Sequence, residues 1–293
     1  MKIVTYHSAS GVADRYRLGV KHDDVNIEEL GSREFSSAEL LEWFDLEKGH
    51  LASWKDLKLE HYGEPMDVAG LRLAPPVPRP GKVICIGLNY RDHAEEANMP
   101  IPESPIIFSK FQTCVVASGD AIEIPEGSAK VDYEAELAFI IGRTAKNVSA
   151  KNAMHHVFGY TNFNDVSARD FQFADGQWQR GKSCDTFAPM GPFIATADEI
   201  ADPHDLGIRF RLNGEILQNS NMGQLIFGVS ELIEFLSRSI TLEPGDVVAT
   251  GTPPGVGFAR KPPIFMKDGD VAEVETDGLG VLSNLVVSNV RTQ

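Results

Sequence analysis

The chain has 293 residues, of which 42% are hydrophobic and 24% are charged, a composition typical of a globular protein with a sizeable core. Its 27 Lys and Arg residues stand against 42 Asp and Glu residues, so the formal net charge is −15 at pH 7. Such a surface repels phosphate groups, which argues against nucleic acid or an anionic membrane as a partner. No apolar run reaches the length of a membrane span, so we expect no membrane segment.

Neither the N-terminus nor the cysteines indicate secretion. The opening residues MKIVTYH lack the charged-then-apolar profile of a secretory signal. The three cysteines, Cys85, Cys114 and Cys184, are widely spaced and form no CxxC pair, so we expect neither a disulfide framework nor a zinc knuckle. We therefore predict reduced thiols and a cytoplasmic protein.

The N-terminal part of the chain is expected to form a small unit. Its pattern predicts a strand at residues 3–6 and a helix at residues 37–44. Four prolines between residues 73 and 81 then predict an extended, semi-rigid linker. The predicted organisation is a small N-terminal domain at 1–72, a proline-rich linker at 73–81 and a catalytic domain at 82–293.

The rest of the chain reads as strands separated by Pro and Gly turns, with few helices. The predicted strands are 82–87, 157–163, 247–250 and 271–275, and the predicted helices are 149–156 and 230–238. Ser149 can cap the first of these helices, and Leu232, Phe235 and Leu236 form one apolar stripe on the second. This pattern predicts an α+β fold that is mainly β, with antiparallel or mixed sheets, and it argues against a doubly wound fold.

Three carboxylates at alternating positions are the first sign of chemistry. The segment 131–142, VDYEAELAFIIG, contains Asp132, Glu134 and Glu136, which project from the same face if the segment is one strand. Like charges at the edge of a core resist desolvation unless a positive group offsets them. A divalent cation with oxygen ligands is the simplest such group, and a solvated acidic strand end is the alternative that this segment leaves open.

A short motif near residue 90 could supply a general base. If Asp92 caps a helix, His93 and Glu96 lie three residues apart on one face. A carboxylate beside an imidazole orients the ring and raises its basicity, as in a base that deprotonates water. Surface His–Glu pairs are also common on helices, so the spacing alone leaves both interpretations open.

Three more stretches contain polar residues that a site could use. Asp165 follows an apolar strand and is a plausible third oxygen ligand, while Arg169 and Asp170 could form an ordinary ion pair. Lys182 follows a glycine and is either a cation beside a ligand or a solvated loop lysine. The loop around Thr252 could present its hydroxyl and backbone N–H groups to an oxyanion, although many such loops are only tight turns.

Taken together, these motifs resemble the fumarylacetoacetate hydrolase superfamily, and within it the branch of the domain-containing-protein-2-like proteins. The resemblance runs from about residue 82 to residue 287, and the N-terminal part matches less clearly. It rests on GLNYRDHAEEAN at 87–98, PIIFSK at 105–110, VDYEAEL at 131–137, NDVSARD at 164–170, GKSCDTFAPMGP at 181–192 and TGTPPGVG at 250–257. It implies a mixed β-sandwich roll that usually forms homodimers.

The resemblance also implies roles for individual residues. It implies that Glu134, Glu136 and Asp165 hold Mg²⁺ or Mn²⁺, with Asp132 outside the ligand set. An oxygen shell without Cys or His suits these hard ions and disfavours zinc. The remaining implied assignments are a catalytic dyad of His93 and Glu96, a catalytic Lys182, and substrate-binding positions at Lys110, Gln172 and Thr252.

The implied substrates are small anionic 2-keto or 2,4-diketo acids. In the leading hypothesis, the cation stabilises an enolate while His93, oriented by Glu96, activates water to cleave a C–C bond of an acylpyruvate-type acid. Lys182 and Thr252 would hold the oxyanion. The alternative uses the same site without water attack, as an oxaloacetate keto–enol tautomerase, a 2-oxo-dioate isomerase or an oxaloacetate decarboxylase. A non-catalytic metal-binding protein is a third hypothesis, and the intact dyad argues against it.

Overall fold

The computed structural model describes residues 1–10, 12–21, 23, 26–30, 33–47, 62–96, 100–174 and 176–288. Within these ranges the chain is mainly β with short helices, as predicted. None of the described helices is long and apolar enough to cross a membrane. The N-terminal unit contains β1 (Lys2–His7), β2 (Tyr16–Lys21), β3 (Asn26–Glu29), α1 (Ser37–Trp43) and β4 (Tyr62–Asp67).

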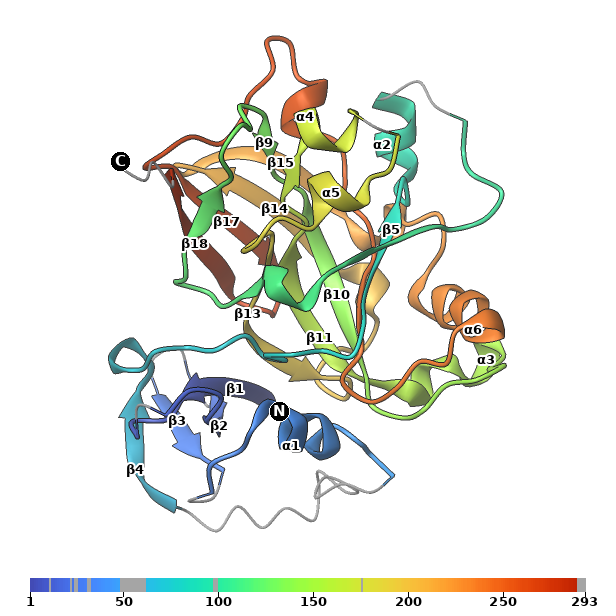
Figure 1. Cartoon of the computed structure of the whole chain (residues 1–293). Coiled ribbons are helices and arrows are strands. Elements are labelled where there is room, and N and C mark those ends of the chain that lie inside the picture. The colour runs from blue at the N-terminus through green and yellow to red at the C-terminus, as the bar shows by residue number, and fades with distance from the viewer. Residues whose placement is uncertain are drawn as a thin grey trace.

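The rest of the described chain holds strands in mixed sheets and a few short helices (Figure 1). The helices are α2 (Arg91–Glu96), α3 (Ala150–Ala153), α4 (Arg169–Gln172), α5 (Gln179–Lys182) and α6 (Val229–Ser239). The strands are β5 (Val83–Gly87), β6 (Ile106–Lys110), β7 (Val115–Val116), β8 (Ile122–Ile124), β9 (Val131–Asp132), β10 (Ala135–Ile141), β11 (Val157–Asn164), β12 (Ser167–Ala168), β13 (Ala188–Thr196), β14 (Gly207–Leu212), β15 (Glu215–Asn221), β16 (Val247–Ala249), β17 (Val271–Thr276) and β18 (Val281–Ser288).

The largest sheet joins the N-terminal unit to the main domain. Its order in the described residues is β4-β3-β2-β1-β13-β11-β10-β16-β5-β6, with β7 beside β13. β1 pairs with β13 in antiparallel register, with Lys2 opposite Ala195. The proline-rich segment packs along β1, because Ala74 N–H donates to the Thr5 carbonyl (2.9 Å) and the Thr5 hydroxyl donates to the Pro76 carbonyl (3.0 Å). The division at 1–72, 73–81 and 82–293 stays our proposal.

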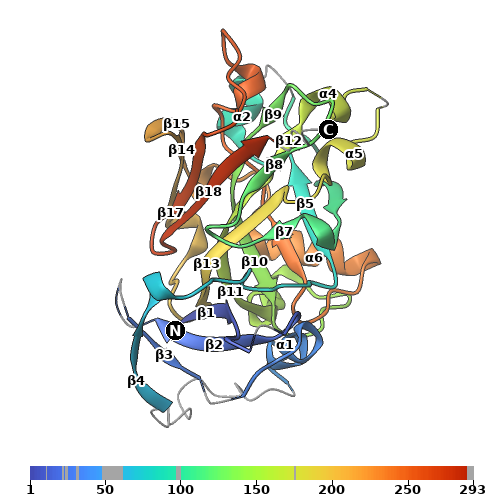
Figure 2. The same ribbon diagram turned by 60° about the vertical axis from the view of Figure 1, so that its left-hand side comes forward.

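A second sheet, ordered β15-β14-β17-β18-β8, packs against the β10, β11 and β13 part of the first (Figure 2). β10 is buried on both of its faces. Phe139 belongs to the core shared with the second sheet, and Ile140 belongs to the core on the opposite side. In that second core, Phe44 at the end of α1 contacts Phe158 edge to face at 4.9 Å. Burial on both faces explains why this strand reads as an almost continuous apolar run.

Local sequence signals explain how several elements begin. Helix α1 starts with a capping box, in which the Ser36 hydroxyl accepts from Glu39 N–H and the Glu39 carboxylate accepts from Ser36 N–H. The helix predicted at 149–156 is α3 followed by a 3₁₀ turn, and its cap residue Ser149 makes no side-chain capping bond. In α6, Leu232 and Leu236 are buried as predicted, whereas Phe235 is only partly buried.

Two local predictions were wrong. The segment 131–142 is not one strand, because the chain leaves the extended ladder at Tyr133 and Glu134. β9 pairs with β12, whereas β10 pairs with β11 and β16, so the segment passes from one sheet to another. Asp92 does not cap α2 either, since the helix begins one residue earlier at Arg91.

Candidate active site

Three buried carboxylates converge where β10 begins and β11 ends. Ala135 of β10 lies opposite Asn164 of β11, so the antiparallel register places the residues that flank this pair side by side. Asp165 N–H donates to the Glu134 carbonyl at 2.9 Å, which ties the two chain segments together. One carboxylate oxygen from each of Glu134, Glu136 and Asp165 lies within 4.8 Å of the other two. These are the residues that the sequence predicted as metal ligands.

Two buried lysines neutralise part of this cluster. Lys182, at the end of α5, lies 2.7 Å from both Glu134 Oε2 and Asp165 Oδ2. Lys110, at the end of the edge strand β6, lies 2.5 Å from Asp165 Oδ1 and donates to the Val166 carbonyl at 3.0 Å. An ammonium group has three N–H donors, so each lysine retains one donor beyond these contacts.

A buried arginine completes the network, and the sequence did not predict its partners. Arg169 lies 2.8 Å from Asp132 Oδ2 and 2.6 Å from Glu134 Oε1, so it does not pair with Asp170. Asp170 instead accepts from Ser128 and from the backbone of Ala129. The guanidinium of Arg169 also lies over the exposed ring of Phe258, 4.4 Å from its centroid.

Asp132 fixes a loop and stays outside the carboxylate cluster. Its Oδ1 accepts from Gly257 N–H at 2.7 Å and its Oδ2 accepts from Phe258 N–H at 3.1 Å. Tyr133 N–H also donates to Oδ1 at 2.9 Å, so the carboxylate of Asp132 is engaged by Arg169 and by three backbone amides. That Asp132 lies outside the metal-ligand set stays a prediction.

The electrostatics of the cluster leave one carboxylate uncompensated. The three carboxylates of the cluster and the neighbouring Asp132 face the three cations Lys110, Arg169 and Lys182, so this ion-pair network carries one excess negative charge. Burial would raise the pKa of Glu134, but Lys182 and Arg169 outweigh it and lower that pKa to about 2. Burial, together with repulsion from Asp165 and Glu134, instead raises the pKa of Glu136 well above its usual value.

A divalent cation fits this donor set. Glu136 Oε2 accepts from Gly251 N–H at 2.9 Å, whereas its Oε1 has no hydrogen-bond partner within the described ranges. An excess negative charge, a free carboxylate oxygen and oxygen donors alone are the features that Mg²⁺ and Mn²⁺ require. The chemistry of the site therefore supports a hard divalent ion held by Glu134, Glu136 and Asp165.

The predicted His–Glu dyad lies on α2 and connects to the cluster through one loop. His93 Nδ1 lies 3.3 Å from Glu96 Oε2, and the His93 side chain is mostly buried. Gly255 N–H donates to both oxygens of Glu96, at 3.1 and 3.2 Å. Because Gly251 in the same loop donates to Glu136, this loop contacts the dyad at one end and the carboxylates at the other.

The side chains of the predicted substrate-binding residues Thr252 and Gln172 make hydrogen bonds within the protein. The Thr252 hydroxyl donates to the Ala135 carbonyl at 3.0 Å and accepts from Gln218 Nε2 at 2.9 Å, so it is engaged within the protein. The backbone N–H of Thr252 has no hydrogen-bond partner in the part of the chain that the structure describes. Gln172 is buried, and its Oε1 accepts from Arg169 at 2.9 Å.

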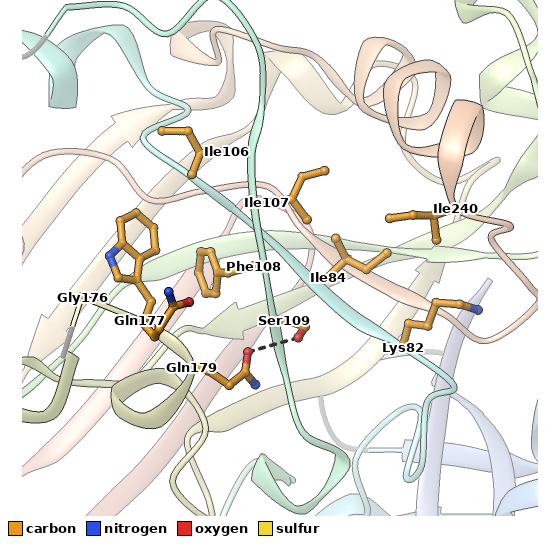
Figure 3. Close-up of a pocket in the computed structure, with 11 residues that line it drawn as sticks. Lys82, Ile84, Ile106, Ile107, Phe108, Ser109, Gly176, Gln177, Gln179 and Ile240 are labelled. Carbon is orange, nitrogen blue, oxygen red and sulfur yellow. Dashed lines mark hydrogen bonds between the residues drawn. The ribbon is translucent and has the colours of Figure 1, made fainter. Parts of the chain in front are cut away.

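An open groove of about 600 Å³ lies along β6 (Figure 3). Phe108 and Trp178 line it and contact each other edge to face, with ring centroids 5.5 Å apart. Lys182 Nζ lies 5.0 Å from the centroid of the Phe108 ring. One aromatic side chain therefore contacts both the groove and a lysine of the carboxylate cluster.

Comparison with known proteins identifies the family. The model of the fumarylacetoacetate hydrolase C-terminal domain matches residues 82–287. The chain belongs to the fumarylacetoacetate hydrolase superfamily. This is an enzyme family, and the matched range contains every residue of the cluster and the dyad.

The curated relatives place the chain in the branch predicted from its motifs. It is 46% identical over 290 residues, 98% of this chain and 90% of the other, to a mitochondrial oxaloacetate tautomerase of Xenopus laevis named fahd2. It is 50% identical over 214 residues, 72% of this chain and 68% of the other, to the human oxaloacetate tautomerase FAHD2A, also named mitochondrial. The chain thus belongs to the FAHD2-like branch of the superfamily.

Solved structures of similar proteins confirm the fold. A fumarylacetoacetate hydrolase of Exiguobacterium antarcticum superposes with a TM-score of 0.84 at 34% identity, over 99% of this chain and 100% of the other. A 2-hydroxyhepta-2,4-diene-1,7-dioate isomerase of Mycobacterium marinum gives a TM-score of 0.78 at 34% identity, with the same coverage.

Proposed function

We propose that this protein is a divalent-metal-dependent tautomerase that interconverts the keto and enol forms of oxaloacetate. The observation that carries the proposal is the likeness, over nearly the whole chain, to a protein named oxaloacetate tautomerase. The buried carboxylates with their excess negative charge support it, because they suit a cation that a small keto acid can chelate. The comparisons therefore favour the alternative function over the hydrolase that the sequence put first.

Glu134, Glu136 and Asp165 would hold Mg²⁺ or Mn²⁺, which when bound supplies a Lewis acid for the 2-keto carboxylate of the substrate. The neighbouring lysines add positive charge to the same pocket. Lys182 and Lys110 each keep one N–H donor that their protein contacts do not use, and these donors would bind the carboxylate oxygens of the substrate.

His93 is the proposed general base. Its Nδ1 faces Glu96, which favours the tautomer with hydrogen on Nδ1 and leaves the Nε2 lone pair free to accept a proton. In the keto-to-enol direction, Nε2 removes a proton from C3 of oxaloacetate, and the C2 oxygen takes up a proton from solvent. In the reverse direction protonated His93 gives a proton to C3, and the C2 hydroxyl releases its proton to solvent. The Thr252 N–H would donate to the oxygen on which negative charge develops.

The proposal can be tested by following the ultraviolet absorbance of enol-oxaloacetate as it converts to the keto form. We expect Mg²⁺-loaded protein to accelerate this decay, chelator-treated protein to lose the acceleration, and added Mg²⁺ to restore it. The exposed variant Glu126→Gln is a matched control for carboxylate substitutions and should behave like the wild type. Acceleration that survives complete metal removal would contradict the metal-dependent mechanism.

Cleavage of an acylpyruvate-type acid is the second candidate function. It is favoured by the His93–Glu96 contact, since a histidine oriented by a carboxylate can also activate water. Product analysis distinguishes this hydrolysis from tautomerisation, because hydrolysis releases pyruvate and a free carboxylic acid whereas tautomerisation releases neither. Isomerisation of a 2-oxo-dioate and decarboxylation of oxaloacetate are distinguished in the same way by their products.

We also propose that the protein is a homodimer. β6 ends the largest sheet, and Ile106 and Ile107 on it are 36% and 39% exposed beside the groove of Figure 3. An exposed apolar edge strand favours pairing with another chain. Light scattering after gel filtration should give twice the mass of one chain, and a single-chain mass would refute the proposal. The cytoplasmic location stays a prediction, because the names of the relatives above include the word mitochondrial.

A further inference from the structure

A second cavity lies away from the carboxylate cluster, where the N-terminal unit meets the main domain. Its volume is about 360 Å³. It is lined by His7 and Tyr16 of the N-terminal strands, by Arg72 and Arg79 at the proline-rich segment, and by Gln112 of the turn after β6. Figure 2 shows the chain between β4 and β5 passing along the N-terminal strands and continuing toward the main domain.

Hydrogen-bond donors in this cavity lack partners. Arg79 is exposed, and it makes no hydrogen bond or ion pair with the described residues. Tyr16 as a whole residue is 8% exposed, and its hydroxyl, which has no hydrogen-bond partner among the described residues, is not one of the buried unpaired groups and remains accessible. A hydroxyl that opens onto the cavity without a protein partner is available to donate to a bound ligand. The two groups interact electrostatically, since Arg79 opposes the rise in the pKa of Tyr16 that burial and the carboxylate of Asp14 cause.

The cavity is locally positive on a protein whose net charge is −15. Two arginines line it against one described carboxylate, that of Asp120. Asp120 Oδ2 accepts a hydrogen bond from Ala117 N–H at 3.0 Å. Asp120 Oδ1 lies 3.9 Å from Arg72 Nη2, so this ion pair is not a close one. Burial and the charge of Arg72 lower the pKa of His7, which keeps this imidazole neutral at pH 7 and able to donate one hydrogen bond.

We propose that this cavity is a binding site for a small oxyanion, a carboxylate or a phosphate, held by Arg79 and the Tyr16 hydroxyl with Arg72 at its rim. A planar guanidinium beside a hydroxyl donor matches the oxygen atoms of either group. The site is distinct from the carboxylate cluster, because no residue lines both. Its ligand is thus additional to the substrate of the proposed reaction.

Isothermal titration calorimetry on the full chain tests the proposal. Chelator-treated protein would be titrated with inorganic phosphate and, separately, with succinate, which has no keto group to react. We expect saturable binding of at least one probe, and the probe that binds decides between phosphate and carboxylate. Arg79→Ala should weaken binding about tenfold or more, the loss expected for one charge-assisted hydrogen bond. Tyr16→Phe should weaken it by a smaller factor.

Arg238→Ala is the matched control, because Arg238 is exposed on α6 and its removal changes the net charge equally. Its affinity for the probe should equal that of the wild type. Two results would overturn the proposal: no saturable binding of either probe, or binding that Arg79→Ala leaves unchanged. The second result would assign the anion to another site, including the catalytic one.

Discussion

Replacing Glu136 by Gln should have opposite effects on the metal-free and the metal-loaded protein. One carboxylate oxygen of Glu136 lies within 4.8 Å of one oxygen each of Glu134 and Asp165. Two unit charges at that separation repel by about 3 kcal/mol at an effective dielectric constant of about 20. Lys182 offsets part of this repulsion. Without metal, the variant should therefore be more stable than the wild type by about 1–3 kcal/mol at pH 8.

With metal the order should reverse, because the variant loses a ligand. A cation at about 100 times its Kd stabilises the wild type by about 2.7 kcal/mol, and the same concentration should stabilise Glu136→Gln far less. Urea unfolding followed by tryptophan fluorescence, with chelator and with Mg²⁺, measures both effects, and Glu126→Gln serves as the control. A variant that is less stable without metal and gains as much from Mg²⁺ as the wild type would refute this account of Glu136.

Three other substitutions test separate parts of the structure. His93→Ala should lower kcat for enol-oxaloacetate by about 10²–10⁴ while leaving the stabilisation by Mg²⁺ intact, and an unchanged kcat would exclude His93 as the base. Arg169→Met should destabilise the protein by about 3–5 kcal/mol in urea unfolding, because Asp132 and Glu134 lose a buried counter-charge. Burial raises the folded-state pKa of Asp246, so its contribution to stability is present at pH 4 and lost as the pH rises through that pKa. The free energy of unfolding of the wild type minus that of Asp246→Asn should therefore decrease from pH 4 to pH 7. A difference that does not change with pH would contradict this prediction.

Much of the local structure could be predicted because its causes are local. The strand at 271–275 and the helix at 230–238 follow from periodicity and turn residues alone, and the structure places β17 and α6 there. The pairing of strands that are distant in the sequence could not be predicted from such local patterns. β1 pairs with β13 across more than half of the chain, and no periodic signal within either strand specifies that partner. The break at Tyr133 arises from pairing with two different sheets, which the alternating pattern does not reveal.

The candidate site, like the fold, could be predicted only in part from the sequence. The acidic pattern pointed to carboxylates in this region, the family resemblance singled out Glu134, Glu136 and Asp165, and the structure brings one oxygen of each together. The role of Arg169 was missed, because its partner Asp132 lies 37 residues away and the adjacent Asp170 was the simpler choice. A signal was present, however, since Arg169 and Gln172 are three residues apart on one helix and share a hydrogen bond. Gln218, which holds Thr252, had no sequence signal in the motifs.

Proton and carbon NMR in D₂O tests the central claim most directly. The purified protein with Mg²⁺ would be given oxaloacetate and, in parallel, an acylpyruvate. We predict faster exchange between keto and enol oxaloacetate, with deuterium entering at C3, and an intact acylpyruvate. Pyruvate and a free carboxylic acid formed from the acylpyruvate, without faster oxaloacetate exchange, would contradict the tautomerase and establish the hydrolase.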